Sequence, residues 1–247
     1  MSAQVLYLVM SGLNATMDRL TANTNNLANA NTTAFKAQRP VFQAFPLYGQ
    51  GLPDRVSVGA QQDTADFSSG PIDHTGRPLD VAINGKGWIG VQASDGSKAL
   101  TRNGSLSVSS TGTLQTSDGR PVLGSNGGPI TLPPMQSITI GTDGTISGAL
   151  VGQPPDQVAA LNRILLTNPP DNQLERGTDG LFRDAQGAPT PDAKVQLQVG
   201  ALEGSNADTI GLMMNMLENT RTFQMQTELV HMVLAAQQGN NTPLSIS

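Results

Sequence analysis

The stretch that decides the fold runs from Ala3 to Lys36 and reads AQVLYLVMSGLNATMDRLTANTNNLANANTTAFK. Leucine recurs in it every seven residues, at Leu6, Leu13, Leu20 and Leu27, with Val9 or Met10 and then Met17 at most of the intervening sites. A seven-residue apolar repeat is typical of a helix that packs lengthwise on other helices. The pattern predicts a helix from about Ala3 to Ala30, roughly 40 Å long at 1.5 Å per residue.

The opposite end of the chain repeats this pattern. Apolar and small residues alternate at spacings of three and four between about Ala207 and Gln238. The expected seam consists of Met213, Met216, Thr220, Phe223, Thr227, Val230 and Leu234. Ser205-Asn206 offers a start signal and Gly239 a stop signal, so we expect a second long helix here.

Turn-forming residues are confined to the segment between the two predicted helices. Of 27 glycines only Gly12, Gly211 and Gly239 lie outside residues 37–204, and of 16 prolines only Pro243 does. Short runs such as 79–83, 137–140 and 195–199 alternate with period two between Asp-Gly turns. These features predict an α+β protein in which both terminal helices pack as a coiled-coil-like stalk beside a central all-β sandwich or irregular barrel. The expected divisions are 1–36 and 205–247 for the assembly helices and 37–204 for the β-rich domain.

The composition limits the classes of partner. Charged residues make up 13% of the 247 residues, the net charge is -5, and no basic block occurs. Nucleic acids and anionic membranes attract clustered Lys and Arg, so we expect neither nucleic-acid binding nor direct membrane insertion. Cysteine is absent, which removes disulfides and thiolate chemistry. Residues 1–10 lack the positive region and cleavage site of a secretory signal, so any export is expected to leave the chain uncleaved.

The search for a catalytic or cofactor motif gives one weak match. Gly85-Lys86-Gly87-Trp88-Ile89-Gly90 fits G-x-G-x-x-G, but strand and turn residues follow where a dinucleotide site needs a helix. A tight turn is the better interpretation. Only His74 and His231 are available as imidazoles. We therefore expect no enzyme activity, no small-molecule substrate, no cofactor and no metal site.

The two apolar seams leave three classes of function open. A two-helix stalk leaves part of each stripe exposed, which favours partners and hence an assembly subunit. The helices could instead pair within one chain and simply close the domain. A binding or adhesin module would place its function on the β domain, and an enzyme would need converging titratable groups. Asn25, Asn26 and Asn29 could be an ordinary helix end, or they could set the register between packed helices.

Three separated motifs resemble those of the bacterial flagellar rod and hook proteins. Residues 25–36, NNLANANTTAFK, resemble the N-terminal signature N-N-L-A-N-x-x-T-x-G-F-K/R, with Ala34 where glycine is common. Residues 202–206, LEGSN, and 213–226, MMNMLENTRTFQMQ, resemble the C-terminal motif, with Thr220 replacing a common glutamine. The third match is TGRPLDVAINGKGW at 75–88, followed by TRNG at 101–104 and DGRPVLG at 118–124.

The resemblance implies a structural subunit of the flagellar basal-body rod. Its partners would be copies of itself, other rod proteins and the flagellar export apparatus, and its location would be the rod in the periplasmic space. The compact length and the third motif favour a proximal rod protein, with a distal rod protein as the alternative. Assembly would use the helix residues. These are Leu6, Leu13, Met17, Leu20, Asn25, Asn26, Leu27 and Asn29 at the N-terminal end, and Met213, Met216, Thr220, Phe223, Val230 and Leu234 at the C-terminal end.

Overall fold

The computed structural model of the chain describes residues 2–46, 56–152 and 158–239 and divides into two compact units. Unit 1 consists of residues 1–30, 38–66 and 207–247, and unit 2 of residues 31–37 and 67–206. The chain therefore enters unit 2 briefly after the first helix, returns to unit 1, and only then builds most of unit 2.

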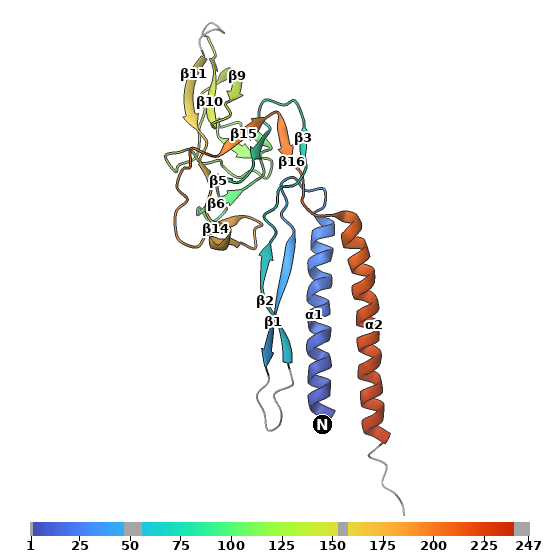
Figure 1. The fold of residues 1–247 in the computed structure, drawn as a ribbon. Helices are drawn as coiled ribbons and strands as arrows, with labels where there is room; N and C mark the ends of the chain where they lie inside the picture. The colour runs from blue at the N-terminus through green and yellow to red at the C-terminus, as the bar shows by residue number, and fades with distance from the viewer. Residues whose placement is uncertain (1, 47–55, 153–157, 240–247) are drawn as a thin grey trace, which may run out of the picture. The chain divides into compact units, whose positions relative to one another are not determined.

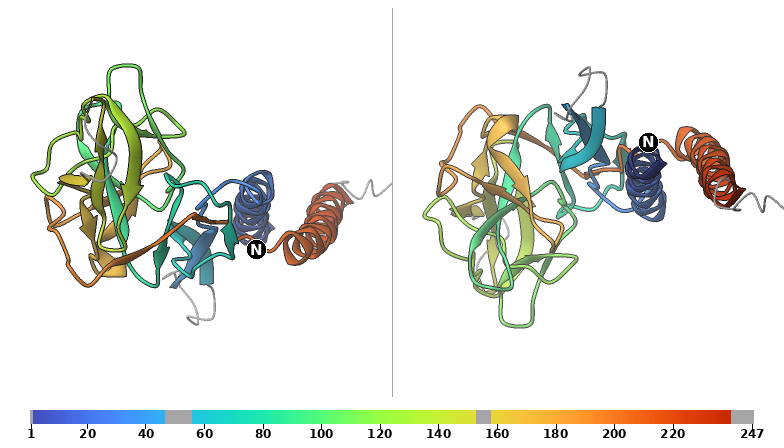
Figure 2. Two further views of the ribbon diagram at one scale, coloured as in Figure 1. Left: turned by 90° about the horizontal axis from the view of Figure 1, so that it is seen from above. Right: turned by 90° about the horizontal axis from the view of Figure 1, so that it is seen from below.

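Unit 1 contains two long helices and a β-hairpin. Helix α1 spans Ser2–Ala28 and helix α2 spans Thr209–Gly239, while β1 (Gln38–Pro46) and β2 (Val56–Ala65) pair antiparallel. Helix α1 contacts α2 and both hairpin strands. Figures 1 and 2 show α1 between the hairpin and α2, with its axis along the strands.

Threonines in the helices are satisfied locally. Thr16, Thr21 and Thr24 each donate a hydroxyl hydrogen bond to the carbonyl four residues earlier, at 2.8–2.9 Å. Such back-bonding keeps a poor helix former inside a helix without an unpaired hydroxyl. Helix α1 ends at the run of asparagines and alanines after Leu27, where Ala30 N donates to the Leu27 carbonyl in a tighter turn.

Unit 2 is built from short strands joined by tight turns. Its strands are β3 (Ile72–His74), β4 (Val81–Asn84), β5 (Trp88–Gln92), β6 (Lys98–Thr101), β7 (Leu106–Val108), β8 (Leu114–Thr116), β9 (Met135–Ile140), β10 (Thr145–Leu150), β11 (Val158–Arg163), β12 (Leu166–Thr167), β13 (Leu174–Arg176), β14 (Phe182–Asp184), β15 (Gln196–Val199) and β16 (Ala201–Glu203). A 3₁₀ turn, η1, spans Asp171–Gln173.

The sheets of unit 2 pair segments that are far apart in sequence. The largest runs in the order β12-β5-β6-β14-β13, and a second runs β11-β10-β9. The first strands meet the last, because β15 pairs with β4 and β16 with β3, both antiparallel. Strands β7 and β8 form a further hairpin.

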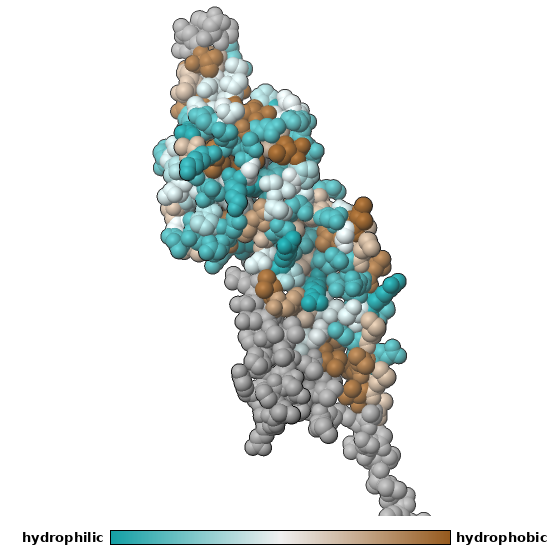
Figure 3. All heavy atoms as spheres, in the orientation of Figure 1, coloured by the Kyte–Doolittle hydropathy of each residue, from teal (hydrophilic) through white to brown (hydrophobic). Residues whose placement is uncertain are grey.

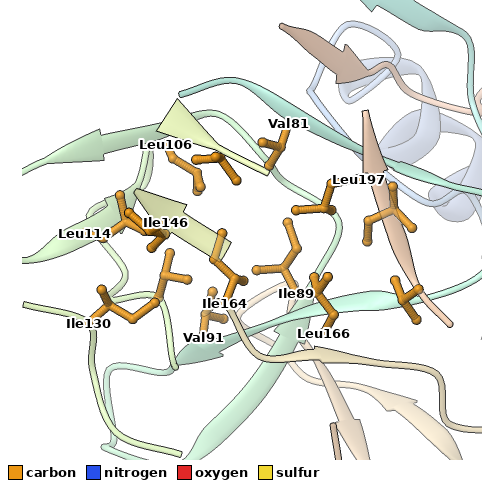
Figure 4. Packing of buried hydrophobic residues seen from close by; sticks show 14 of the residues in the cluster. Val81, Ile89, Val91, Leu106, Leu114, Ile130, Ile146, Ile164, Leu166 and Leu197 are labelled. Carbon is orange, nitrogen blue, oxygen red and sulfur yellow. The ribbon is translucent and has the colours of Figure 1, made fainter. Parts of the chain in front are cut away.

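One hydrophobic core fills unit 2. Its members include Val81, Ile83, Ile89, Leu106, Leu114, Ile130, Ile146, Ile164 and Leu197, each no more than 2% exposed (Figure 4). Gly85 (φ 81°) lies in the turn between β4 and β5, and Gly87 (φ 140°) packs against the side chain of Val195. The G-x-G-x-x-G match is thus part of a strand–turn–strand connection, without the helix that a dinucleotide site requires.

The predicted fold class is wrong. Among the described residues the protein is mostly β, and its strands form six separate sheets instead of one sandwich or barrel. The helices do not form a coiled-coil-like stalk of their own, because the β1–β2 hairpin is part of the same unit and contacts α1. Residues 38–66, which the sequence placed in the central β segment, cluster with the helices.

The leucine heptad misled the prediction for a physical reason. Among the described side chains of α1, from residue 9 onward, the buried positions are small or polar: Ala15, Thr16, Ala22 and Asn26. Small side chains allow the hairpin and α2 to approach the helix closely, whereas Leu13, Leu20 and Leu27 remain only half-buried. A heptad shows that a helix has an apolar stripe but does not identify the element that covers it.

Candidate functional site

The predicted N-terminal assembly residues are not equivalent in the structure. Leu13, Leu20 and Leu27 are half-buried, Met17 is 47% exposed, and Asn25 is exposed. Asn29 is half-buried, and its side-chain amide donates to the Asn25 carbonyl at 2.9 Å. The side chain of Leu6 lies outside the described residues. Their role in contacts between subunits stays a prediction.

Asn26 has a defined partner within unit 1. Its side chain is 3% exposed. Nδ2 donates to the Gln38 carbonyl at 2.9 Å, and the Gln38 amide donates to Oδ1 at 2.7 Å. The side-chain amide of Asn26 thus pairs with the backbone of Gln38 as a neighbouring strand would. It connects α1 to the first residue of β1.

The contact between the helices is close and partly polar. The Thr16 hydroxyl reaches Gln226 Oε1 at 3.1 Å, and a Cβ placed on Gly12 would lie 3.4 Å from Gln226 Nε2. Arg19 holds its guanidinium carbon 4.6 Å from the Phe42 ring centroid on β1. Helix α1 thus meets α2 and the hairpin through different side chains.

The predicted seam of α2 is partly covered. Met216, Phe223 and Val230 are half-buried, whereas Met213, Thr220 and Leu234 are exposed. The Thr220 hydroxyl donates to the Met216 carbonyl at 2.7 Å, so this position is satisfied within the helix.

Helix α2 also carries an apolar surface that the sequence analysis missed. Its members recur at spacings of four, three, eight and seven residues and therefore share one face. They are Ile210, Met214, Leu217, Met225 and Met232, each between 54% and 74% exposed. We call this set the outer face of α2; apolar groups along this side of unit 1 are brown in Figure 3. The signal was available in the sequence, since Ile210 lies just before the first member of the predicted seam and the other four residues lie between its members.

Unit 2 contains a second feature, a buried ion cluster of Lys36, Arg102 and Glu203. Their side chains are 0%, 4% and 1% exposed. Lys36 Nζ lies 2.6 Å from Glu203 Oε1, and Arg102 Nη1 lies 2.9 Å from Oε2. The Gly70 amide also donates to Oε1 at 3.1 Å. The single Glu203 carboxylate thus pairs with both buried cations. Buried charges need such opposite charges nearby, because burial removes them from water.

The remaining donors of the cluster are also satisfied. Lys36 Nζ donates to the Ser68 carbonyl at 2.6 Å. Arg102 donates from Nη2 to the Gly85 carbonyl at 2.6 Å and from Nε to the Gly87 carbonyl at 3.1 Å. Each of the three guanidinium nitrogens of Arg102 thus donates at least one hydrogen bond, which offsets the cost of burying this group.

The segments 34–37 and 203–206 lie side by side next to this cluster. The Ala34 amide donates to the Glu203 carbonyl at 2.7 Å, and the Ala37 amide donates to Asn206 Oδ1 at 2.7 Å. Ala34 has φ 59°, the left-handed conformation that favours glycine. The polypeptide segments that follow α1 and precede α2 are therefore hydrogen-bonded to each other inside unit 2.

Arg176 covers the aromatic side of this region. Its guanidinium carbon lies 4.8 Å from the Phe35 centroid and 5.6 Å from the Phe182 centroid, and Nη1 donates to the Lys36 carbonyl at 2.9 Å. Burial lowers the pKa of Arg176 from its ordinary value. Trp88 packs on Phe182 with ring centroids 4.7 Å apart.

The cluster joins the three motifs that the sequence analysis treated separately. Lys36 ends the N-terminal signature, Arg102 lies in the TRNG segment, and Glu203 lies in the LEGSN segment. None of the three was expected to form a site. The available signal for this cluster was that each residue is charged within a mostly uncharged motif. The pairing of Lys36 with Glu203, 167 residues later, could not be predicted from sequence spacing.

Neither a metal-binding cluster nor a membrane-spanning helix occurs in the described part of the chain. No group of three or more His, Cys, Asp or Glu side chains is arranged there to hold a metal ion. No helix there combines the length and the apolarity needed to cross a bilayer.

Matches to protein families cover both ends and the centre of the chain. Residues 6–36 match the flagella basal body rod protein family, 82–148 the flagellar hook protein FlgE/F/G D1 domain, and 198–233 the C-terminal family of flagellar basal body rod FlgEFG proteins. The chain belongs to the flagellar basal-body rod protein family, and the predicted membership is confirmed.

Sequence identities to individual rod proteins differ between FlgF and FlgG relatives. The chain is 41% identical to the flagellar basal-body rod protein FlgF of Salmonella typhimurium, with 98% of each chain covered. It is 39% identical to FlgF of Escherichia coli, covering 92% of this chain and 93% of that protein. Identity to the rod protein FlgG of Bacillus subtilis is 30%, covering 91% and 93%.

Proposed function

We propose that this chain is a structural subunit of the bacterial flagellar basal-body rod, resembling FlgF, that assembles through its terminal helices. The observation that carries the assembly mechanism is the outer face of α2, with five large apolar side chains that are more than half exposed. Family membership supplies the setting, because the relatives are named as basal-body rod proteins.

The energetics of the outer face favour a protein partner. Burying one side chain of this size is worth about 1.5–3 kcal/mol relative to leaving it exposed. An extended row of such side chains is unusual on a protein that remains alone. Met10 and Met17 on α1, 52% and 47% exposed and seven residues apart, offer a second apolar row on the other helix.

The partners are other rod subunits, including further copies of this chain. A surface on α2 that docks on a different surface of the next subunit is heterologous, and such contacts extend instead of closing. A tube built this way transmits torque through packed helices without chemistry in each subunit. The function therefore needs neither a catalytic group nor a cofactor.

The location follows from the same assignment. The subunit resides in the rod of the basal body, in the periplasmic space, and reaches it through the flagellar export apparatus. We assign it to the proximal rod, the position expected from the sequence, because identity is higher to the two FlgF proteins, at 41% and 39%, than to FlgG of Bacillus subtilis, at 30%.

The substitution Leu217→Asp tests the assembly surface. Leu217 is 65% exposed, so a charge there leaves the isolated chain folded but opposes burial against a partner. We expect cells that carry only this variant to lose motility and to contain it in cell fractions but not in purified basal bodies. Antibody detection of the chain in both preparations makes the measurement.

Asn215→Asp is the matched control, because it adds the same charge at an exposed polar position of the same helix. We expect this control to enter basal bodies at the wild-type level. Normal incorporation of Leu217→Asp alongside the control would overturn assembly through the outer face.

A further inference from the structure

The last two strands of unit 2, β15 and β16, pair with its first two strands, β4 and β3. Residues 195–206, which we call the closing segment, contribute five buried side chains to unit 2. Val195, Leu197, Ala201, Glu203 and Ser205 are each at most 8% exposed. Leu197 lies in β15, Ala201 and Glu203 lie in β16 two residues apart, and Val195 and Ser205 flank the two strands. The closing segment is therefore part of the core, although it comes last in unit 2.

The early strands depend on the closing segment for their sheet partners. Within the described residues β3 pairs in a sheet only with β16, and β4 only with β15. Strand β4 is central to the core, because Val81, Ala82 and Ile83 are all at most 1% exposed. Without the closing segment, most backbone groups on one edge of a buried strand would have no partner, which is costly.

The ion cluster adds an electrostatic condition. Glu203 is the carboxylate that binds both Lys36 and Arg102, and these cations belong to segments much earlier in the chain. A unit 2 that folded before Glu203 arrived would bury two positive charges without a counter-ion. Such burial is strongly unfavourable, so a chain that ends before Glu203 is expected to lack a stable folded unit 2.

We propose that the closing segment makes the folding of unit 2 conditional on delivery of the chain as far as residue 206. A chain delivered N-terminus first stays unfolded in unit 2 until β15, β16 and Glu203 are present. Unit 2 then folds in one step, and α2 begins at Thr209, immediately afterwards. This inference concerns folding and does not depend on the rod function.

Native-state hydrogen exchange on the full-length chain tests the proposal. If unit 2 has no stable form without the closing segment, amides of β15 and β16 exchange only when β4, β5 and β6 also open. We expect one common opening free energy and one common denaturant dependence for these strands. Exchange of β15 and β16 through a lower-energy opening, with β4–β6 still protected, would overturn the proposal.

Two variants sharpen the test. Glu203→Gln leaves both cations without a counter-charge, and we expect faster exchange by a common factor of about a hundred or more in β4–β6 and in β15–β16. Glu175→Gln, at an exposed position of β13, is the control and leaves exchange unchanged. Acceleration restricted to β15 and β16 would contradict the proposal.

Leu197→Ala supplies the comparison if Glu203→Gln yields no folded unit 2. Leu197 is 2% exposed and belongs to the shared core, so its truncation weakens the closing segment without removing a charge. We again expect uniform acceleration across β4–β6 and β15–β16. A change confined to β15 and its immediate neighbours would overturn the inference.

Discussion

Ala34 adopts a backbone conformation that its side chain opposes. Its φ of 59° lies in the left-handed region, and its amide donates to the Glu203 carbonyl. The geometry is fixed by the hydrogen bonds on both sides, from Phe35 N to the Thr32 carbonyl and from Ala37 N to Asn206. The glycine that is common at this position in the rod and hook signature is the residue that this conformation favours.

Ala34→Gly is therefore expected to stabilise unit 2. The left-handed conformation costs an alanine roughly 1–2 kcal/mol, and the greater flexibility of glycine in the unfolded chain offsets part of the gain. We expect a net increase of up to about 1 kcal/mol in the free energy of unfolding. Chemical denaturation followed by the fluorescence of Trp88, the single tryptophan and a residue of unit 2, measures it.

Ala185→Gly provides the control, since Ala185 is exposed in a turn and has no positive φ. Glycine there only increases the freedom of the unfolded chain and should lower stability by a few tenths to 1 kcal/mol. Equal losses at both positions would contradict strain at Ala34.

Asp179 gives unit 2 a defined acid sensitivity. Arg183 binds it with both nitrogens, at 3.0 and 2.9 Å, and this hydrogen bonding holds the pKa of Asp179 below its ordinary value of 3.8. A depressed folded pKa contributes stability that is present above the unfolded pKa and lost as pH falls through the folded one. The contribution should therefore decline below about pH 4.

Asp179→Asn removes this contribution. We expect the variant to be less stable than wild type at neutral pH, with the difference shrinking as pH falls below about 4. Unfolding curves by Trp88 fluorescence from pH 7 to pH 2 measure the difference. Asp73→Asn, at an exposed carboxylate of β3, is the control. A difference for Asp179→Asn that stays constant over this range would show that the ion pair is not its source.

At the scale of elements, the sequence predicted types better than partners. Residues 79–83 and 195–199 were predicted as strands, and both contain one: Val81, Ala82 and Ile83 are buried in β4, and Leu197 is buried in β15. The pairing of β15 with β4 was not predictable, because alternation gives the faces of a strand but not its neighbour. The ion cluster was missed for the same reason, since Lys36, Arg102 and Glu203 come together only after these pairings form.

The hairpin of unit 1 illustrates the same limit. Nothing local in the sequences of its two strands indicated that they would pack on α1 instead of joining the other strands. The buried face of α1, with Ala15, Ala22 and Asn26, carried the missing information. Small residues at regular spacing indicate that another backbone can approach the helix closely. The leucine heptad, in contrast, led to the prediction that α1 packs mainly on another helix.

Asn26→Ala tests the connection between α1 and the hairpin. It removes the two hydrogen bonds to Gln38 and leaves part-buried backbone groups without these partners, at a cost of about 1–3 kcal/mol. We expect hydrogen exchange in β1 and β2 to accelerate markedly. The control Asn25→Ala, on the exposed side of the helix, should have little effect, because alanine has the higher helix propensity. Equal responses would show that the Asn26 pair adds nothing to unit 1.

For the whole molecule, the described side chains of the two units differ in how much apolar surface they bury. Unit 2 surrounds one large core, while the buried hydrophobic side chains of unit 1 within the described residues are Ala15 and Ala22. Burial of large apolar side chains dominates folding stability. Because five large apolar side chains on the outer face of α2 are more than half exposed, we expect unit 1 to gain order from partners that cover this face, and we expect unit 2 to be stable alone.

The isolated chain is therefore expected to unfold in two transitions that separate probes can resolve. Helix circular dichroism reports α1 and α2, both in unit 1, whereas Trp88 is 3% exposed in unit 2. In dilute protein, unit 1 lacks partners and should unfold first, so the denaturant midpoint of the helix signal should fall below the midpoint of Trp88 fluorescence. Two different midpoints would show that the units unfold separately, because a single cooperative unit gives the same midpoint with every probe. Raising the protein concentration should move the helix midpoint upward if copies cover one another, since association stabilises the folded form by mass action. Leu217→Asp should remove that concentration dependence and leave the Trp88 midpoint unchanged. Coincident midpoints at every concentration would instead mean that unit 1 is fully stabilised within a single chain, and the terminal helices would then have no energetic need of a partner.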